Sequence, residues 1–168
     1  PVAHALVGTT LYLHGSPASA ALRAAASGEP VSLSAVVLEG VVVAHSACRG
    51  GINYRSVLCS GTGHEVTDRD EAELALRAIT ERFTPGGWER GRLPRPDEVA
   101  TTAVAAVAIT GFSIRARSGP AREDEADRAL PTWSGVVPLQ LTTGPALPDP
   151  GVPPDSPVPP VLPGSISG

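Results

Sequence analysis

The residues best suited to bind an anion lie where a predicted strand runs into a predicted helix. Residues 10–14 (Thr-Leu-Tyr-Leu-His) have strand character, and Gly15 and Ser16 follow directly. Pro17 is then expected at the first position of a short Ala/Leu helix over 18–26, with Ser16 as its N-cap. The first amides of a helix lack internal partners and carry the positive end of its dipole, so this segment predicts a phosphate site. A capped helix without a ligand is the alternative, and it is the commoner arrangement.

A second candidate is the strand segment 53–57 (Asn-Tyr-Arg-Ser-Val). Side chains alternate along a strand, so Tyr54 and Ser56 share one face and Arg55 lies on the other. The planar guanidinium of Arg55 has the donor geometry that binds a phosphate through two parallel hydrogen bonds. A surface arginine whose aliphatic stem lies over the sheet is the open alternative.

No set of residues in the sequence predicts a protein nucleophile, an acid–base pair or a metal site. His45, Cys48 and Cys59 do not have the spacing of a structural zinc site. The chain has no Gly-x-Ser-x-Gly elbow, no His-Glu-x-x-His motif and no Walker loop. His4 and His14 fit strand patterns as ordinary core or rim histidines. We therefore predict no catalytic side chain and no metal ligand, and we expect any reaction to use a cofactor.

The elements that would position these residues are mostly strands. Strands are predicted at residues 10–14, 31–38, 41–46, 53–61, 103–117 and 133–141, the second and third joined in a hairpin by Glu39-Gly40. Helices are predicted at residues 18–26, 67–83 (opened by a capping box at Thr67 and Asp70) and 97–101. This order favours a mainly β fold, a small antiparallel barrel with peripheral helices, over a doubly wound sheet.

The composition of the chain limits which partners and locations we expect for the protein. The chain has 168 residues, 42% of them apolar and 18% charged, which is enough for one domain with a core. The net charge of −4 argues against a nucleic-acid partner and against a polybasic membrane anchor. No apolar run reaches the roughly 18 residues of a membrane span, and no signal peptide is visible. Because the chain also has only two cysteines, we expect a cytoplasmic location.

Two parts are predicted along the chain. Residues 1–141 contain every predicted element and form one domain. Residues 142–168 are rich in proline, with almost no charge and no periodicity, so they predict a disordered, polyproline-like tail.

Three motifs in order along the chain resemble one known family. Residues 10–19, 53–57 and 131–138 (Pro-Thr-Trp-Ser-Gly-Val-Val-Pro) are similar to the pyridoxamine 5′-phosphate oxidase family, in its flavin-nucleotide-binding branch close to the nitroimidazole-resistance proteins. The resemblance implies an FMN-binding split β-barrel, Greek-key-like, that forms a homodimer with the flavin between its subunits. It also implies a flavin-dependent oxidoreductase that passes hydride or electrons from a reduced nicotinamide to a small electron-poor substrate.

The same resemblance assigns residues to the cofactor. The residues with an implied role in cofactor binding are His14, Gly15, Ser16, Ser19, Arg23, Arg55, Ser56 and Trp133. The first four, with the helix after them, would hold the FMN phosphate. Arg55 and Ser56 would contact the flavin or its phosphate, and Trp133 would lie near the cleft or the dimer contact. Arg23 is the nearest base after Ser19, because alanines stand where relatives usually carry basic residues, and this predicts a weaker phosphate clamp.

Departures from the family pattern leave other functions open. Relatives usually carry a helix and a strand before the position of Pro1, which predicts a chain truncated at its N-terminus with an open barrel edge. Residues 46–53 also lack the histidine pair often seen there in relatives. One alternative is haem or a deazaflavin in the same barrel, with His14 or His45 as the axial haem ligand. Another is a degenerate, non-catalytic member with an empty cleft.

Overall fold

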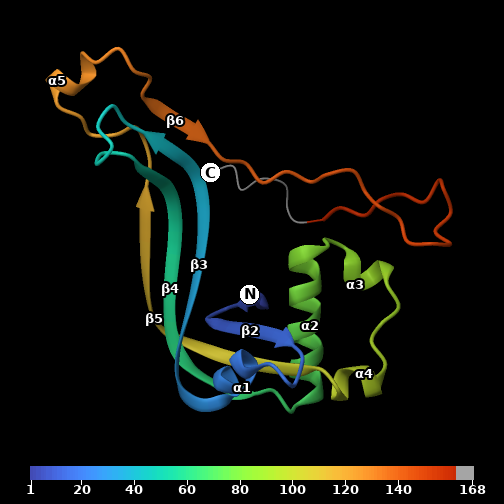
Figure 1. Cartoon of the computed structure of the whole chain (residues 1–168). Helices are drawn as coiled ribbons and strands as arrows, with labels where there is room; N and C mark the ends of the chain where they lie inside the picture. The colour runs from blue at the N-terminus through green and yellow to red at the C-terminus, as the bar shows by residue number, and fades with distance from the viewer. Residues whose placement is uncertain (162–168) are drawn as a thin grey trace. The chain divides into compact units, whose positions relative to one another are not determined.

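The computed structural model describes residues 1–161 and shows a mainly antiparallel sheet with a few short helices (Figure 1). Its strands are β1 (Ala3–Val7), β2 (Thr10–Gly15), β3 (Ser27–Val43), β4 (Gly51–Glu65), β5 (Ala103–Arg117) and β6 (Gly135–Pro138). Its helices are α1 (Ala20–Ala26), α2 (Arg69–Phe83), α3 (Gly87–Arg90), α4 (Pro96–Ala100) and α5 (Glu125–Arg128). The strand order is β1-β2-β5-β4-β3-β6. Within it, β2-β5-β4-β3 has the strand order of a Greek key.

The chain divides into two compact units, which are described separately. The first unit comprises residues 1–31, 60–110 and, of the described tail, 143–161. The second unit comprises residues 32–59 and 111–142. Residues 142–161 contain no helix or strand and are exposed, and the remainder of the predicted tail, 162–168, lies outside the described residues.

The first unit contains an antiparallel hairpin that positions the end of β2. Val7 pairs with Thr10 across a turn in which Gly8 has a φ of +61°, a conformation that glycine adopts without strain. Strand β2 also pairs antiparallel with β5, so that His14 lies opposite Val104 and Gly15 opposite Ala103. The polar end of β2 is therefore fixed by two neighbouring strands.

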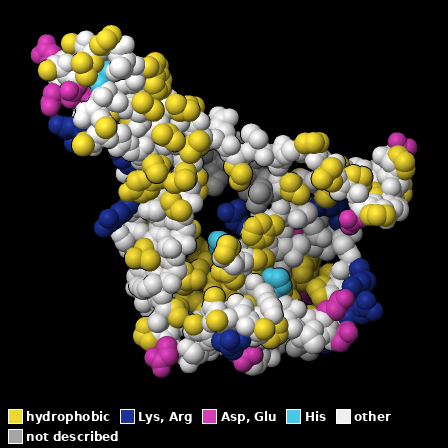
Figure 2. Space-filling model, in the orientation of Figure 1, with side chains coloured by type: hydrophobic (Ala, Val, Ile, Leu, Met, Phe, Trp, Pro, Cys, Tyr) yellow, Lys and Arg dark blue, Asp and Glu magenta, His cyan; other side chains and the backbone are white. Residues whose placement is uncertain are grey.

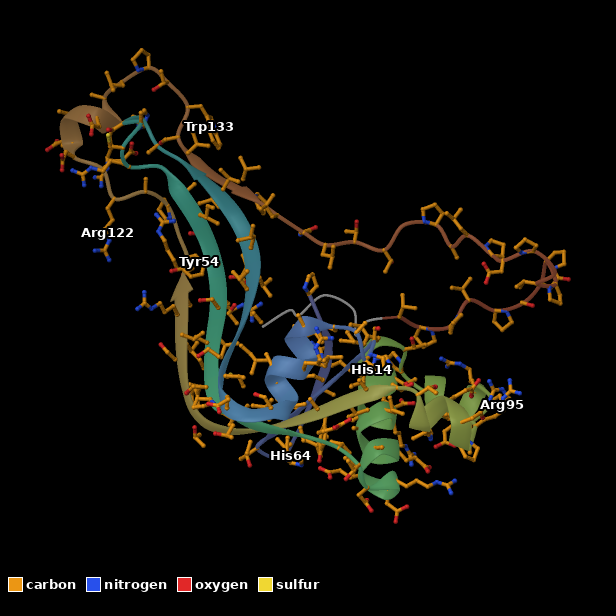
Figure 3. All side chains as sticks on the ribbon, turned by 60° about the horizontal axis from the view of Figure 1, so that its bottom comes forward. His14, Tyr54, His64, Arg95, Arg122 and Trp133 are labelled. Atoms are coloured by element: carbon orange, nitrogen blue, oxygen red, sulfur yellow. The ribbon has the colours of Figure 1, made fainter. Side chains whose placement is uncertain are left out.

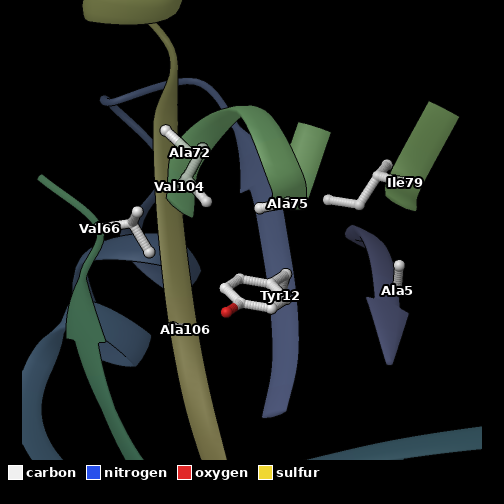
Figure 4. Close-up of a cluster of buried hydrophobic side chains, with 8 residues drawn as sticks. All are labelled: Ala5, Tyr12, Val66, Ala72, Ala75, Ile79, Val104 and Ala106. Atoms are coloured by element: carbon white, nitrogen blue, oxygen red, sulfur yellow. The ribbon is translucent and has the colours of Figure 1, made fainter. Parts of the chain in front are cut away.

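Helix α2 and the sheet form the core of the first unit. Ala72, Ala75 and Ile79 recur at helical spacing and are buried. They belong to a cluster of buried side chains drawn in Figure 4: Ala5, Tyr12, Val66, Ala72, Ala75, Ile79, Val104 and Ala106. Residues 104–107 of β5 are all buried, so this half of the strand is covered on both faces.

Tyr12 joins this core to the polar side of α2. Its hydroxyl donates a hydrogen bond to Glu71 Oε1 at 3.0 Å. Burial, and then the neighbouring Glu71 carboxylate, raise the pKa of the Tyr12 phenol, which therefore stays a neutral donor. We expect Tyr12→Phe to lower the free energy of unfolding by about 1 kcal/mol through loss of this bond. Urea denaturation followed by circular dichroism measures the change, and unchanged stability would contradict the proposed contribution.

The second unit exposes many apolar side chains. Strand β3 pairs antiparallel with β6, from Gly40 opposite Pro138 to Val43 opposite Gly135. Figure 2 shows hydrophobic side chains gathered over these strands, in the upper left of the view. The large exposed ones on β3, β4 and β5 are Val36, Val37, Leu38, Val41, Ile52, Leu58, Phe112 and Ile114. Exposed apolar area of this extent is typical of a surface that meets a partner or a ligand.

The predicted hairpin turn at Glu39-Gly40 is wrong, because β3 runs without a break from Ser27 to Val43. Gly40 instead allows β6 to approach closely. A Cβ at this position would lie 3.0 Å from Cγ1 of Val136 and 3.1 Å from the carbonyl oxygen of Val137. The glycine thus serves a packing contact between distant segments rather than a turn.

The caps and several short elements also differ from the prediction. Helix α2 is capped by Asp68, which accepts from the Glu71 amide at 2.9 Å, and not by Thr67. Strand β1 is not predicted beyond the strand pattern around His4, and helices α3 and α5 are not predicted at all. Strand β5, in contrast, has the predicted bounds.

Candidate functional site

The predicted phosphate segment forms a tight turn in the first unit, between β2 and α1. The Ser19 amide donates to the Ser16 carbonyl oxygen at 2.9 Å, and the Ser16 hydroxyl accepts from the Ala18 amide at 3.2 Å. Helix α1 begins at Ala20 with Ser19 as its N-cap, so the prediction of a helix from residue 18 capped by Ser16 is wrong. The Ser16 hydroxyl bonds the local backbone and stabilises a turn in place of the first helical residues.

Arg23 lies against this turn. Its Nη1 donates to the carbonyl oxygens of Ala18, at 2.6 Å, and Pro17, at 3.3 Å. Ala20 and Ala21 are exposed residues, and their amides make no hydrogen bond within the described residues. The turn therefore presents two free amides beside a guanidinium, which are the donors that bind a phosphate.

His14 and Gly15 support the turn from the end of β2. His14 is half-buried, and its Nδ1 is buried without a hydrogen-bond partner in residues 1–161. Buried polar atoms are normally paired, so this nitrogen marks a place for a water or a bound group. At Gly15, a Cβ would lie 3.1 Å from Cδ1 of Leu22, so glycine lets α1 pack closely against the strand.

Arg55 in the second unit is held by an acidic neighbour. Its Nε donates to Glu39 Oε1 at 2.6 Å, and the two side chains are 40% and 34% exposed. A pair this exposed contributes only about 0–1 kcal/mol to stability, but it neutralises the guanidinium. A phosphate at Arg55 would have to compete with Glu39.

Tyr54 and Ser56 line a shallow hollow of about 520 Å³ in the second unit (Tyr54 is labelled in Figure 3). The other lining residues are Val36, Leu38, Gly50, Gly51, Ile52 and Arg117. The walls are thus mostly apolar, with two hydroxyls and one guanidinium. Such a lining suits a flat ring that carries a polar or anionic substituent.

Arg117 is the residue of this hollow that sequence reasoning missed. Its Nη1 donates to Asn53 Oδ1 at 2.9 Å, and Asn53 Nδ2 donates to the Gly119 carbonyl oxygen at 3.1 Å. Asn53 is buried, with 6% of its surface exposed, so it anchors the guanidinium at a fixed position. Asn53 stands in the recognised 53–57 motif, but nothing in the sequence pairs it with a residue 64 positions away.

Trp133 also lies in the second unit, just before β6 (Figure 3). Its indole is 63% exposed and rests on Gly135, where a Cβ would lie 3.0 Å from Trp133 Cζ2. An exposed indole has contact area left for a ligand or partner. Its contact with a cofactor stays a prediction.

A buried acid–base pair joins the turn after β3 to the loop after β5 in the second unit. His45 Nδ1 lies 3.0 Å from Glu123 Oε2, and the side chains are 8% and 6% exposed. Burial raises the pKa of Glu123, but hydrogen bonds from the His45 ring and backbone lower it further, to below its ordinary value. Because a carboxylate holds Nδ1, Nε2 is the ring nitrogen left to bind a ligand, as is usual in metal-ligating histidines.

None of the helices in residues 1–161 is both long and apolar enough to cross a membrane. Within the same residues, no three His, Cys, Asp or Glu side chains gather in a way that could hold a metal ion.

Comparison with known proteins places these features in a family. The sequence profile of the family described as pyridoxamine 5′-phosphate oxidase matches residues 1–116. None of the curated proteins matches the chain.

Two solved structures are similar over nearly the whole chain. The flavocytochrome Anf3 from Azotobacter vinelandii is 35% identical, with a TM-score of 0.84, over 95% of this chain and 74% of that one. The FAD and haem binding protein from Mycobacterium smegmatis is 37% identical, with a TM-score of 0.87, over 95% of this chain and 78% of that one.

A third structure is a more distant neighbour and bears on the fold alone. It is described as a 5-nitroimidazole antibiotic resistance protein from Bacteroides thetaiotaomicron and is 19% identical, with a TM-score of 0.50, over 68% of this chain and 65% of that one. The predicted split-barrel fold, mainly antiparallel sheet with few helices, is confirmed by the two closer structures. With its profile covering residues 1–116, the chain belongs to the pyridoxamine 5′-phosphate oxidase family.

Proposed function

We propose that the chain is a flavin-nucleotide-binding oxidoreductase that passes hydride or electrons from a reduced nicotinamide to a small electron-poor substrate. The observation that carries this proposal is the hollow lined by Tyr54, Ser56 and Arg117, whose apolar walls and single guanidinium suit a flavin ring. Two relatives described as a flavocytochrome and an FAD and haem binding protein support a flavin ligand. FMN is the flavin that the family resemblance implies.

Each unit offers candidate binding residues of its own. In the first unit, His14, Gly15, Ser16, Ser19 and Arg23 form the turn that would donate hydrogen bonds to a phosphate. In the second unit, Ser56 would border a flavin ring in the hollow, whereas Arg55 and Trp133 do not line that hollow and their contacts with a cofactor stay predictions. A bound flavin would supply the hydride chemistry, while the side chains would bind and orient it.

Flavin titration tests this proposal. We expect FMN, at micromolar protein, to lose fluorescence on binding and to raise the melting temperature. Arg23→Gln should weaken FMN binding about tenfold through loss of one charge-assisted contact, yet leave the affinity for riboflavin, which lacks the phosphate, unchanged. Arg69→Gln removes an exposed arginine on α2 and serves as the charge-matched control. Absence of binding by both FMN and FAD would refute the flavin proposal. Binding of a deazaflavin alone would show that a deazaflavin, and not FMN, is the ligand.

Haem is a second candidate ligand, and the orientation of His45 favours it. A histidine with Nδ1 on a carboxylate and Nε2 free is arranged as a metal-ligating histidine, and both closer relatives are described as haem or cytochrome proteins. We expect a shifted Soret band on haem addition that is lost in His45→Ala, or in His14→Ala if the unpaired His14 is the ligand. His64, labelled in Figure 3, is exposed and provides the control variant. A spectrum identical to free haem would exclude this candidate.

A homodimer and a cytoplasmic location complete the proposal. The exposed side chains of Val36, Phe112 and Ile114, at 61%, 70% and 66%, support a second copy of the chain as the partner of this apolar surface. Light scattering coupled to size exclusion should give twice the chain mass of 17.1 kDa, with Phe112→Ser shifting the protein toward monomer. A wild-type monomer at all concentrations would refute the dimer.

A further inference from the structure

A second hollow in the second unit is strongly cationic. It has a volume of about 330 Å³ and is lined by Cys48, Arg49, Arg117, Ser118, Pro120 and Arg122. Its three arginines come from three segments: the turn after β3, the end of β5 and the loop after it. The chain has 13 arginines and no lysine and is acidic overall, so three guanidinium groups around one hollow are a local concentration of positive charge.

Most of this charge is not neutralised by the protein. Arg49 forms an exposed ion pair with Asp124 at 3.2 Å. Arg117 bonds only neutral oxygens, those of Asn53 and Ile52. The Arg122 guanidinium has no hydrogen bond or ion pair within residues 1–161, and its side chain extends from the loop in Figure 3. Like charges repel when they share a site, so this arrangement favours a bound anion.

We propose that the hollow lined by Arg49, Arg117 and Arg122 is a pyrophosphate site that takes the bridging diphosphate of a dinucleotide. Two arginines without a carboxylate partner give a charge of +2, which matches the two negative charges of that diphosphate. Arg117 also lines the neighbouring apolar hollow, so one guanidinium borders both a ring site and an anion site. The dinucleotide is either FAD or the reduced nicotinamide dinucleotide that donates electrons. This inference deepens the proposed function, and its anion component is testable without a flavin.

Calorimetric titration of the purified chain with inorganic pyrophosphate tests the anion site directly. We expect saturable binding that is tighter than that of orthophosphate and is weakened by salt. Arg122→Gln and Arg49→Gln should each weaken pyrophosphate binding about tenfold. Neither change removes a buried contact, so both variants should fold, which their melting curves check. Arg128→Gln on α5 removes an exposed arginine away from the hollow and should bind pyrophosphate as the wild type does.

Titrations with flavins and with NADPH identify which dinucleotide carries the bound diphosphate. If it is FAD, Arg122→Gln weakens the binding of both FAD and FMN, because the phosphate of FMN is one of the two phosphates of that diphosphate and then binds here and not at the turn after β2. If it is the nicotinamide dinucleotide, the same variant weakens NADPH binding and leaves both flavins unchanged. Loss of pyrophosphate binding in Arg122→Gln supports the anion site even if the wild-type protein binds no flavin. Absence of flavin binding would refute only the proposed function. Equal affinity of wild type, Arg49→Gln and Arg122→Gln for pyrophosphate, FAD and NADPH would overturn the inference.

Discussion

Gly63→Ala is expected to destabilise the first unit strongly. A Cβ at residue 63 would overlap the carbonyl oxygen of Ala25, at the end of α1, and would lie 3.0 Å from Cγ2 of Val107 and 3.1 Å from the carbonyl oxygen of Ala106. Two of these neighbours are backbone atoms, which cannot rotate away as a flexible side chain can. The strand β4 must therefore separate from α1 or from β5, and either movement opens the core.

The cost should be about 3 kcal/mol or more, at the upper end of overpacking in a well-packed core. For a chain of this length, that corresponds to a fall in melting temperature of roughly 10 °C. Gly61→Ala should behave similarly, because its Cβ would overlap the Ala108 carbonyl oxygen. Calorimetry of the purified variants, or their loss to the insoluble fraction, measures the effect.

Gly144→Ala is the matched control, because nothing lies within 4 Å of a Cβ at that position and its φ needs no glycine. The control should melt within about 2 °C of the wild type. A Gly63→Ala variant that melted with the control would mean that β4 does not approach α1 as closely as the structure shows.

The elements that sequence reasoning predicted well are those fixed by their own residues. Strand β5 has the expected bounds because 103–117 is a long, mostly apolar run with several β-branched residues and no proline. The prediction of a turn at Glu39-Gly40 was wrong because a glycine in the sequence is compatible both with a tight turn and with a close contact between strands. The neighbours that decide this, Val136 and Val137, lie almost a hundred residues further along the chain.

The residues of the candidate site also fall into those that the local sequence predicts and those that it does not. Strand alternation indicated that Tyr54 and Ser56 share a face, and both line one hollow. Arg117 and Arg122 could not be found from sequence, since their significance arises only when the end of β5 and its following loop meet the turn after β3. The His45–Glu123 pair spans 78 positions and has no local signature. The sequence motifs identified the family, whereas long-range contacts decide the charge around the candidate site and the orientation of the side chains in it.

Replacement of Glu123 should release the loop after β5 from the turn after β3. Glu123→Ala removes the acceptor for both the backbone amide and the ring Nδ1 of His45, which leaves two polar groups unpaired where the side chains are 8% and 6% exposed. We expect a fall in melting temperature of roughly 5–10 °C at pH 7. Glu123→Gln keeps one carbonyl oxygen for the His45 amide, so its melting temperature should fall by about half as much. Asp124→Asn, whose carboxylate is 74% exposed, should change little.

The pH dependence of this loss distinguishes a charged acceptor from simple packing. The pKa of Glu123 lies below its ordinary value of 4.5 in the folded protein, because hydrogen bonds from His45 outweigh the effect of burial. A carboxylate with a depressed folded pKa stabilises the fold above its unfolded pKa, and that stabilisation disappears as the pH falls through the folded value. The gap in melting temperature between wild type and Glu123→Gln should therefore be constant near pH 6–7 and should close as the pH drops below about 4.5. A gap that stayed the same down to pH 3 would show that the carboxylate charge contributes nothing and that Glu123 acts by its shape.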